Sequence, residues 1–111
     1  MTKNTHLNLS NAKGIYHIAV TDISYIQANG ACSATYTENG DKITCCKNLA
    51  AITRDLKNND DFIRVHRSYI VNKKQVRMYK KEDGGKILMN DGTEILVAKR
   101  RKKEFISQLR K

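Results

Sequence analysis

The sequence predicts a mainly β fold, made of small antiparallel sheets in a β-hairpin meander, with one short internal helix and a short C-terminal helix. Three observations predict this class. Apolar and polar residues alternate in short runs, Asn-Gly and similar turn signals separate these runs, and helical spacing of apolar residues occurs at only two places. With 111 residues, no proline, no internal repeat and no low-complexity linker, residues 1–111 are expected to form one domain.

The first half of the chain is predicted to form a hairpin followed by a three-stranded meander. The hairpin joins Thr5–Leu9 to Ile15–Val20 through a turn at Asn11–Gly14. The meander turns at Asn29-Gly30 and at Asn39-Gly40, because these dipeptides favour positive φ. Its three strands are Ile23–Ala28, Cys32–Thr37 and Lys42–Cys46.

The internal helix is predicted where the apolar period changes from two to about 3.6. Asn48 can cap it, and Leu49, Ile52 and Leu56 fall on one stripe, with Arg54 and Lys57 outside the stripe. The polar cluster Asn58–Asp61 ends it. A helix of about ten residues is marginal alone, so its apolar stripe is expected to pack on the sheet.

The second half begins with the stretch Phe62–Asn72 and continues as hairpins. Further strands are predicted at Val76–Lys81, Lys86–Met89 and Glu94–Ala98, and the basic run Lys99–Lys103 leads into a helix with Phe105, Ile106 and Leu109 at helical spacing. The chain is thus expected to contain about nine strands.

Composition restricts the partners and the compartment. Lys and Arg number 21 against 11 acidic residues, a formal charge of +10 that points to a polyanion. Three cysteines cannot all pair internally, so we expect a reduced, cytoplasmic protein. No apolar run approaches the ~20 residues needed to cross a bilayer, and Met1 to Ser10 contains no leader pattern, so no membrane partner or secretion is expected.

The residues that could carry catalysis or bind a metal have no recognisable arrangement. Cysteines, histidines and aspartates occur without a local signature, and the glycines do not form a phosphate loop between strand and helix. We therefore expect no enzymatic activity, no cofactor and no metal. The vicinal pair Cys45-Cys46 would point to opposite faces of a strand; oxidation sensing or soft-metal binding is conceivable there, but core filling is the favoured interpretation.

The triplet His66-Arg67-Ser68 lies between apolar residues and should sit where the chain turns or reaches solvent, because an unpaired buried polar group costs roughly 2–7 kcal/mol. Arg presents a planar fork that suits O6 and N7 of guanine, and Ser and His can make single hydrogen bonds. The plainer interpretation is a satisfied histidine and a surface arginine on an ordinary β protein. At this point both interpretations stand.

Basic residues occur in clusters, at Lys73-Lys74, Lys80-Lys81 and Lys99–Lys103, in or beside turns that we expect at one end of several strands. Asn29, Arg67 and Arg100-Arg101 are the base-reading candidates, since Asn and Arg can make paired hydrogen bonds to bases. The aromatic residues do not form the dense strand motif of single-strand binders, which favours duplex DNA. The alternative is a non-specific RNA-binding or ribosome-associated basic protein.

The run from Phe62 to Asn72 resembles the most distinctive motif of the LytTR DNA-binding domain of bacterial transcription regulators, Phe-x-Arg-apolar-His-x-Ser-Tyr-apolar-Val-Asn. The resemblance continues through Asp22–Ile26, the helix with Leu49 and the closing Leu88–Val97 segment, and covers roughly residues 5–110. It implies small antiparallel sheets and sequence-specific duplex binding by loops that enter successive major grooves, often on paired direct repeats and with some bending.

Carried over by position, the resemblance places base-facing residues in the loop that holds Asn29 and Ser33, at Arg67, and at Lys99-Arg100. Arg101 and Lys102 extend this last basic segment, and His66 and Ser68 are expected to brace the bend or touch phosphate. This chain has Ala98-Lys99 where the family generally shows Ser-Arg, so the third contact can shift to Arg100 or become a phosphate contact. The resemblance also implies a response-regulator output domain, with a receiver or sensor domain elsewhere, and leaves open a homodimer on DNA.

Overall fold

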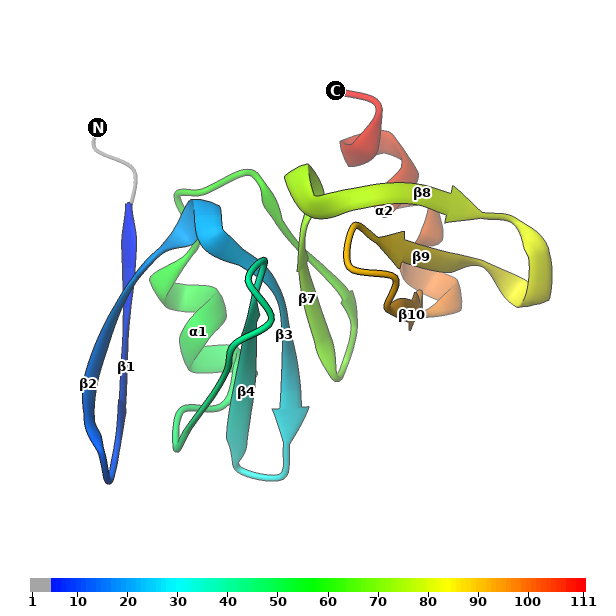
Figure 1. Ribbon diagram of the computed structural model, residues 1–111. Helices are drawn as coiled ribbons and strands as arrows, with labels where there is room; N and C mark the ends of the chain where they lie inside the picture. Colours follow the sequence, from blue (N-terminus) through cyan, green and yellow to red (C-terminus); the bar gives the residue numbers. More distant parts are fainter. Residues whose placement is uncertain (1–4) are drawn as a thin grey trace.

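The computed structural model describes residues 5–111, apart from the side chain of Asp83, as small antiparallel sheets with two short α-helices (Figure 1). The mainly β class expected from the sequence is confirmed. The first four residues, part of the segment Met1 to Ser10 in which no leader is expected, lie outside this range. In the described residues, no helix is long and apolar enough to cross a bilayer.

A five-stranded sheet forms the centre of the molecule, in the order β5-β4-β3-β7-β6. Its strands are β3 (Ile23–Asn29), β4 (Cys32–Thr37), β5 (Lys42–Cys45), β6 (Phe62–His66) and β7 (Tyr69–Asn72). The predicted Asn-Gly turns are confirmed by positive φ, +62° at Gly30 and +90° at Gly40, a conformation that glycine adopts without a steric penalty.

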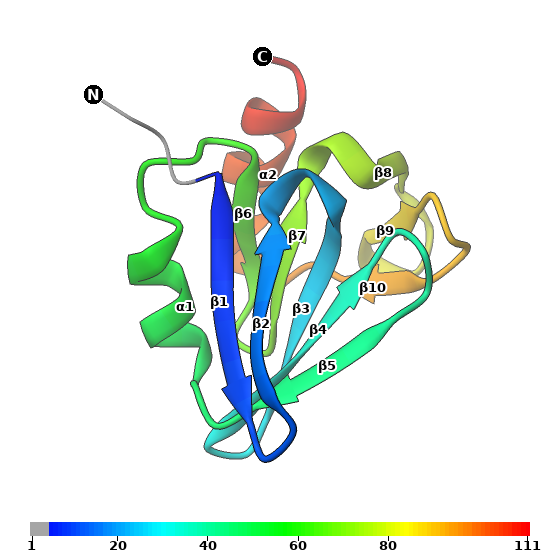
Figure 2. The same ribbon diagram turned by 60° about the vertical axis from the view of Figure 1, so that its left-hand side comes forward.

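Two smaller sheets flank the central one (Figure 2). The first pairs β1 (His6–Asn11) with β2 (Gly14–Ala19), and the second has the order β10-β9-β8, with β8 (Val76–Lys80), β9 (Lys86–Met89) and β10 (Glu94–Leu96). The described residues thus contain ten strands rather than about nine, because the stretch Phe62–Asn72 folds as two strands that turn at Arg67-Ser68. Single 3-10 turns lie at η1 (Val20–Asp22), η2 (Lys73–Gln75), η3 (Glu82–Gly84) and η4 (Lys99–Arg101).

The helices are α1 (Leu49–Asp55) and α2 (Lys102–Leu109). Asn48 caps α1 as predicted, since its Oδ1 accepts a hydrogen bond from the Ala51 backbone N–H at 2.9 Å. The predicted stripe of Leu49, Ile52 and Leu56 is buried against the central sheet and the β1-β2 hairpin. Packing therefore stabilises a helix that would be marginal alone.

Both faces of the central sheet are buried, each in its own core. Ile26 and Ile70 face α1 and the β1-β2 hairpin. Val65 and Val71 face the opposite way, toward the β8-β9-β10 sheet and Phe105 of α2. Adjacent residues of one strand point to opposite faces, which explains why apolar residues follow each other without alternation at Tyr69–Val71.

The cysteines divide between the interior and the surface. Cys45 is buried, whereas Cys46 is exposed, so the two residues point to opposite sides as predicted. Core filling is therefore correct for Cys45, which belongs to the core that faces α1. It is wrong for Cys46, which follows the last residue of β5 and is exposed.

Candidate nucleic-acid interface

Two turns lie together at one end of the central sheet. The β3-β4 turn carries the exposed Asn29, and the β6-β7 turn carries the exposed Arg67. A backbone hydrogen bond from Ala28 N–H to the Ser68 carbonyl, 2.8 Å long, joins the two hairpins at this end. Both turns point toward the bottom of the molecule in Figure 1. Two residues that are far apart in the sequence thus belong to one surface.

The backbone of the β6-β7 turn is held by the Arg64 guanidinium. Arg64 Nε donates to the His66 carbonyl at 3.0 Å, and a terminal guanidinium nitrogen donates to the Arg67 carbonyl at 2.7 Å. Burial lowers the pKa of Arg64, and the nearby charge of Arg101 lowers it further, although an arginine remains protonated. The guanidinium is therefore engaged inside the turn, and the neighbouring Arg67 side chain is exposed on a fixed backbone.

His66 contributes a second brace to this turn. Its Nδ1 accepts a hydrogen bond from the Ser68 backbone N–H at 3.1 Å, and its ring meets the edge of the Tyr69 ring with centroids 5.9 Å apart. Because Nδ1 is an acceptor, the neutral imidazole carries its proton on Nε2. His66 therefore braces the bend, one of its two expected roles; its contact with phosphate, like that of Ser68, stays a prediction.

The third segment, η4, is attached to the same strand. Ala98 N–H donates to the Val65 carbonyl at 2.8 Å, and an Arg101 terminal nitrogen donates to the Arg64 carbonyl at 3.4 Å. These contacts place the exposed side chains of Lys99 and Arg100 beside the β6-β7 turn. Arg101 and Lys102 are half-buried, so the outward-facing part of the basic run begins with Lys99 and Arg100.

One residue expected at the interface lies in the interior. Ser33 is 0% exposed, and its Oγ lies 3.5 Å from Cys45 Sγ on the inner side of the β4-β5 pair. A side chain without exposed surface cannot reach a base unless the sheet opens, so the expectation for Ser33 is corrected and the residue is omitted from the interface.

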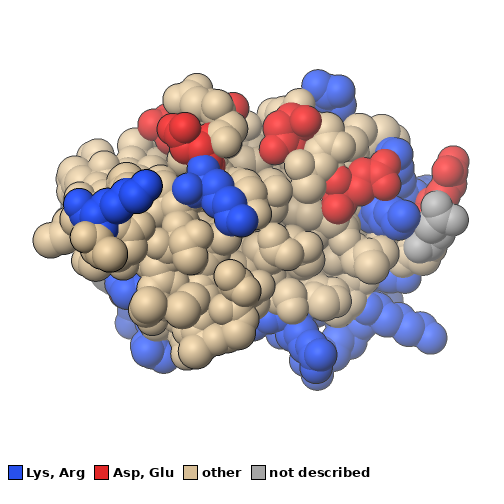
Figure 3. Space-filling model, turned by 60° about the horizontal axis from the view of Figure 1, so that its bottom comes forward, with Lys and Arg blue, Asp and Glu red and all other residues tan. Residues whose placement is uncertain are grey.

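The basic clusters are not all at one end, which corrects a second expectation. Lys73 and Lys74 follow β7 at the end opposite to Arg67, and Lys74 pairs with Asp61 at 3.5 Å. Lys80 donates to Glu94 at 2.6 Å, a contact that also holds the Glu94 pKa below its usual value. Figure 3 looks toward the end that carries the Asn29 and Arg67 turns. Acidic side chains lie in its upper half together with some basic ones, and the charged side chains along its lower margin are basic.

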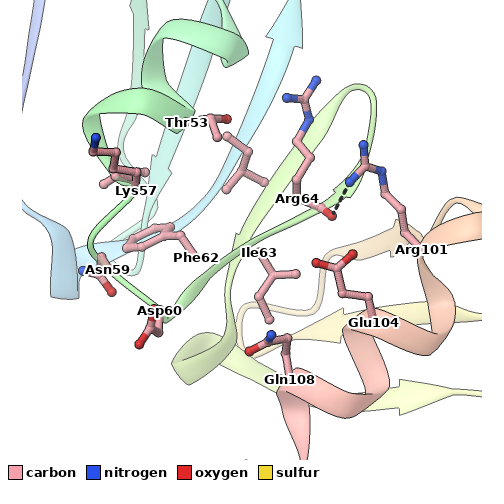
Figure 4. A pocket seen from close by; sticks show the side chains of 12 residues that line it. Thr53, Lys57, Asn59, Asp60, Phe62, Ile63, Arg64, Arg101, Glu104 and Gln108 are labelled. Atoms are coloured by element: carbon pink, nitrogen blue, oxygen red, sulfur yellow. Dashed lines mark hydrogen bonds between the residues drawn. The ribbon is translucent and has the colours of Figure 1, made fainter.

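A pocket of about 250 Å³ lies behind the braced turn, between α1, β6 and α2 (Figure 4). Arg64, Arg101 and Glu104 line it together with Phe62 and Ile63. Among the described residues, the buried Arg101 Nε has no hydrogen-bond partner. In the described residues no group of three or more metal-ligating side chains is assembled, and the residues that line this pocket are basic, acidic, amide, threonine and apolar ones, without a cysteine, serine or histidine.

The structure thus has the architecture of small antiparallel sheets, with the exposed Asn29 and Arg67 turns together at one end. The family model described as the LytTr DNA-binding domain matches residues 13–110, and this chain belongs to that family of DNA-binding domains of transcription regulators. The family is non-enzymatic, so the expectation of no catalytic activity is confirmed.

Two relatives illustrate the family. The chain is 41% identical over 76 residues to the CO-responsive transcriptional regulator RcoM of Rhodospirillum rubrum, a match that covers 68% of this chain and 31% of that protein. It is 21% identical to the solved LytTr DNA-binding domain of a putative methyl-accepting/DNA response regulator from Bacillus cereus, with a TM-score of 0.81, and the match covers 96% of this chain and 97% of that one. The chain thus spans about a third of the length of its curated relative, and its fold is that of the solved domain.

Sequence reasoning missed the role of Arg64. The residue lies inside the distinctive run, one strand position from Val65, and alternation indicates that the two side chains point to opposite sides. The signal that could have identified it is an arginine three residues before Arg67 at the start of a tight turn, where a long side chain can fold back onto the turn carbonyls.

Replacing Arg64 should loosen the turn that carries Arg67. We expect Arg64→Leu to lower the free energy of unfolding by about 1–3 kcal/mol, because it leaves two carbonyls without their charged donor. The Ala28 amide should also exchange faster with solvent, since its acceptor is in the released turn. Urea denaturation and amide hydrogen exchange measure these two effects.

Arg64→Lys is the matched control, because it retains the charge but not the two-pronged geometry. We expect it to lose most of the protection at Ala28. Unchanged exchange at Ala28 in both variants would show that Arg64 does not hold the turn.

Proposed function

We propose that this chain binds duplex DNA sequence-specifically through turns inserted into the major groove, as the output domain of a transcriptional regulator. One observation carries this proposal. Backbone hydrogen bonds bring the exposed side chains of Asn29, Arg67 and Lys99-Arg100 to one end of the molecule from three separate chain segments. Asn and Arg side chains can make paired hydrogen bonds to base edges. A surface that binds nucleic acid through charge alone does not require such side chains, and it does not require an uncharged Asn.

The three segments have different roles in the proposal. Arg67 is exposed on a braced turn and reads guanine with its planar fork, and Asn29 reads adenine. Lys99 supplies charge for the phosphates, while Arg100 supplies either a base contact or a second phosphate contact. The Nε2–H of His66 and the hydroxyl of Ser68, at the edge of the same turn, donate to phosphate oxygens.

The dimensions of the molecule fit contacts with adjacent grooves. The domain measures 40 × 32 × 24 Å. One helical turn of B-DNA spans about 34–36 Å, so a single domain lying along the duplex can reach two successive major grooves on one face. A major groove about 12 Å wide admits a two-stranded hairpin end.

The full-length protein, in this proposal, carries a receiver or sensor domain in addition to this one and acts in the cytoplasm. The support is that the curated relative is about three times as long as the matched region and is itself a regulator that responds to a signal. Two copies would read paired direct repeats, either as a homodimer on DNA or as independently bound domains, with some bending of the duplex.

A non-specific RNA-binding or ribosome-associated role is the second candidate. The net charge of +10 supports it, because charge alone is sufficient for binding without sequence preference. Both candidates lose affinity as the salt concentration rises. On duplex DNA, the logarithm of the binding constant falls with the logarithm of the salt concentration, with a slope of about −0.9 per phosphate contact. Sequence preference, rather than salt dependence, therefore separates them.

Selection of bound duplexes from a random pool tests the proposal directly. We expect an enriched sequence, and we expect the chain to prefer it over a shuffled duplex by roughly 10³-fold or more at one fixed salt concentration. Fluorescence anisotropy with labelled duplexes measures the two dissociation constants. Equal affinity for all duplexes, or tighter binding to RNA of the same length, would contradict sequence-specific binding.

Arg67→Ala should remove the reading of one base. We expect a loss of about 1–3 kcal/mol on the selected site and a flattened preference at a single position. Arg67→Lys retains the charge, so it should recover part of the affinity but not the base preference. A repeat of the selection with each variant measures both effects.

Lys74→Ala is the matched control, since it removes an exposed cation at the opposite end of β7. We expect little change in affinity or preference. If Arg67→Ala instead weakens all duplexes equally, Arg67 acts only through its charge and the assignment is wrong.

A further inference from the structure

Two thiols face each other at the end of the β4-β5 pair, near the β3-β4 turn. Cys32 begins β4 and is half-buried, and Cys46 follows the last residue of β5 and is exposed. The third cysteine, Cys45, lies on the inner side with its Sγ 3.5 Å from Ser33 Oγ. Cys32 and Cys46 therefore occupy the outer side of a strand pair whose inner side is filled.

The strand register leads these two cysteines toward each other. Ser33 is paired with Cys45 at the end of the β4-β5 ladder. Cys32 and Cys46 are the next residue of each chain segment beyond that pair, and Cys46 lies one residue past the end of β5. Side chains of opposed residues on one face of an antiparallel pair are neighbours. Because Cys32 and Cys46 lie next to the last pair of the ladder, their side chains are expected on the same face of the β4-β5 pair, beside each other.

The pattern of backbone hydrogen bonds defines the kind of pair. Thr37 N–H donates to the Asp41 carbonyl, so that Thr37 and Asp41 form a hydrogen-bonded pair. Hydrogen-bonded and non-hydrogen-bonded pairs alternate along an antiparallel ladder, so the pair of Ser33 and Cys45 is of the hydrogen-bonded kind. If the alternation is continued by one position beyond the ladder, Cys32 and Cys46 correspond to a non-hydrogen-bonded pair. In such a pair the Cα atoms are about 4.5 Å apart, within the range of roughly 4.4–6.8 Å that disulfides span.

The two thiols also influence each other electrostatically. The Cys46 side chain is the main cause that raises the Cys32 pKa, as expected for neighbouring thiols. Exposure makes Cys46 the sulfur that an oxidant in solution reaches first. Cys45 cannot replace either partner without leaving the core, because it points to the opposite face.

We propose that Cys32 and Cys46 are an oxidation site that forms a reversible intramolecular disulfide. With a peroxide as oxidant, the Cys46 thiolate attacks one peroxide oxygen and breaks the O–O bond, giving a sulfenic acid and hydroxide, which takes up the thiol proton to become water. The Cys32 sulfur then attacks the Cys46 sulfur; the S–O bond breaks and a second water leaves with the remaining thiol proton. In total, two thiols and one hydrogen peroxide give one disulfide and two waters.

The site is independent of DNA binding and can be tested on the free domain. Its location also matters for the surface described above, because Cys32 is paired with Asn29 in the β3-β4 hairpin. The bond would tie the base of the Asn29 turn to the end of β5. Thiol chemistry and DNA affinity are separate measurements, so failure of one leaves the other standing.

The test is mild oxidation of the reduced protein with hydrogen peroxide at low protein concentration. We expect the intact mass to fall by two hydrogens, two of the three thiols to disappear from a titration in denaturant, and dithiothreitol to restore both. The oxidised form should melt at a higher temperature than the reduced form, because the cross-link restricts the unfolded chain.

Cysteine variants identify the bond. Cys32→Ser and Cys46→Ser should each abolish the mass loss, whereas Cys45→Ala should retain it. Should Cys45→Ala fail to fold, fragmentation of the cross-linked peptide from the unaltered protein distinguishes a bond at Cys46 from one at Cys45. Oxygen addition without cross-linking, a covalent dimer, or a disulfide that persists in Cys46→Ser would overturn the proposal.

Discussion

The pairing of β3 with β7 joins two hairpins into one surface, and the hydrogen bond from Ala28 to the Ser68 carbonyl extends that pairing to the end of the sheet that carries Asn29 and Arg67. The bond holds only if the Ser68 carbonyl stays in place, which requires the β6-β7 turn to be rigid. The side chains of Arg64 and His66 supply that rigidity, because they make three hydrogen bonds to the backbone of the turn. The exposed residue that we propose for base reading, Arg67, therefore differs from the residues that position its turn.

Burial of both faces of the central sheet leaves its ends as the surface available for recognition. The faces of β3 and β7 are covered by α1 and the β1-β2 hairpin on one side and by the β8-β9-β10 sheet with α2 on the other. The free edge of β6 is partly occupied by the C-terminal segment, because Ala98 and Arg101 bond to the carbonyls of Val65 and Arg64. This cover protects an edge strand and at the same time attaches the segment with Lys99 and Arg100 to β6, the strand that leads into the Arg67 turn.

Local signals in the sequence predicted the elements well, and tertiary relations account for what they missed. The Asn-Gly turns and the Asn48 cap depend on a few adjacent residues, so they could be identified without the fold. Ser33, Ala34 and Thr35 are all buried, because both faces of β4 are covered. The sequence of β4 alone does not show that both of its faces are covered. The location of Lys73-Lys74 depends on the direction in which β7 crosses the sheet, and the proximity of Cys32 and Cys46 depends on strand register. Base contacts by Asn29, Arg67 and Arg100 stay predictions.

We propose that three separate segments act as one DNA-binding surface. Amide chemical-shift changes in isotope-labelled protein, recorded when the selected duplex is added, test this. We expect the largest changes to occur together around Gly30, Arg67-Ser68 and Lys99-Arg100, with small changes at Gly40 and at Lys73-Lys74 at the far end of the sheet. Changes centred on Lys73-Lys74, or spread evenly over the basic residues of the surface, would contradict it.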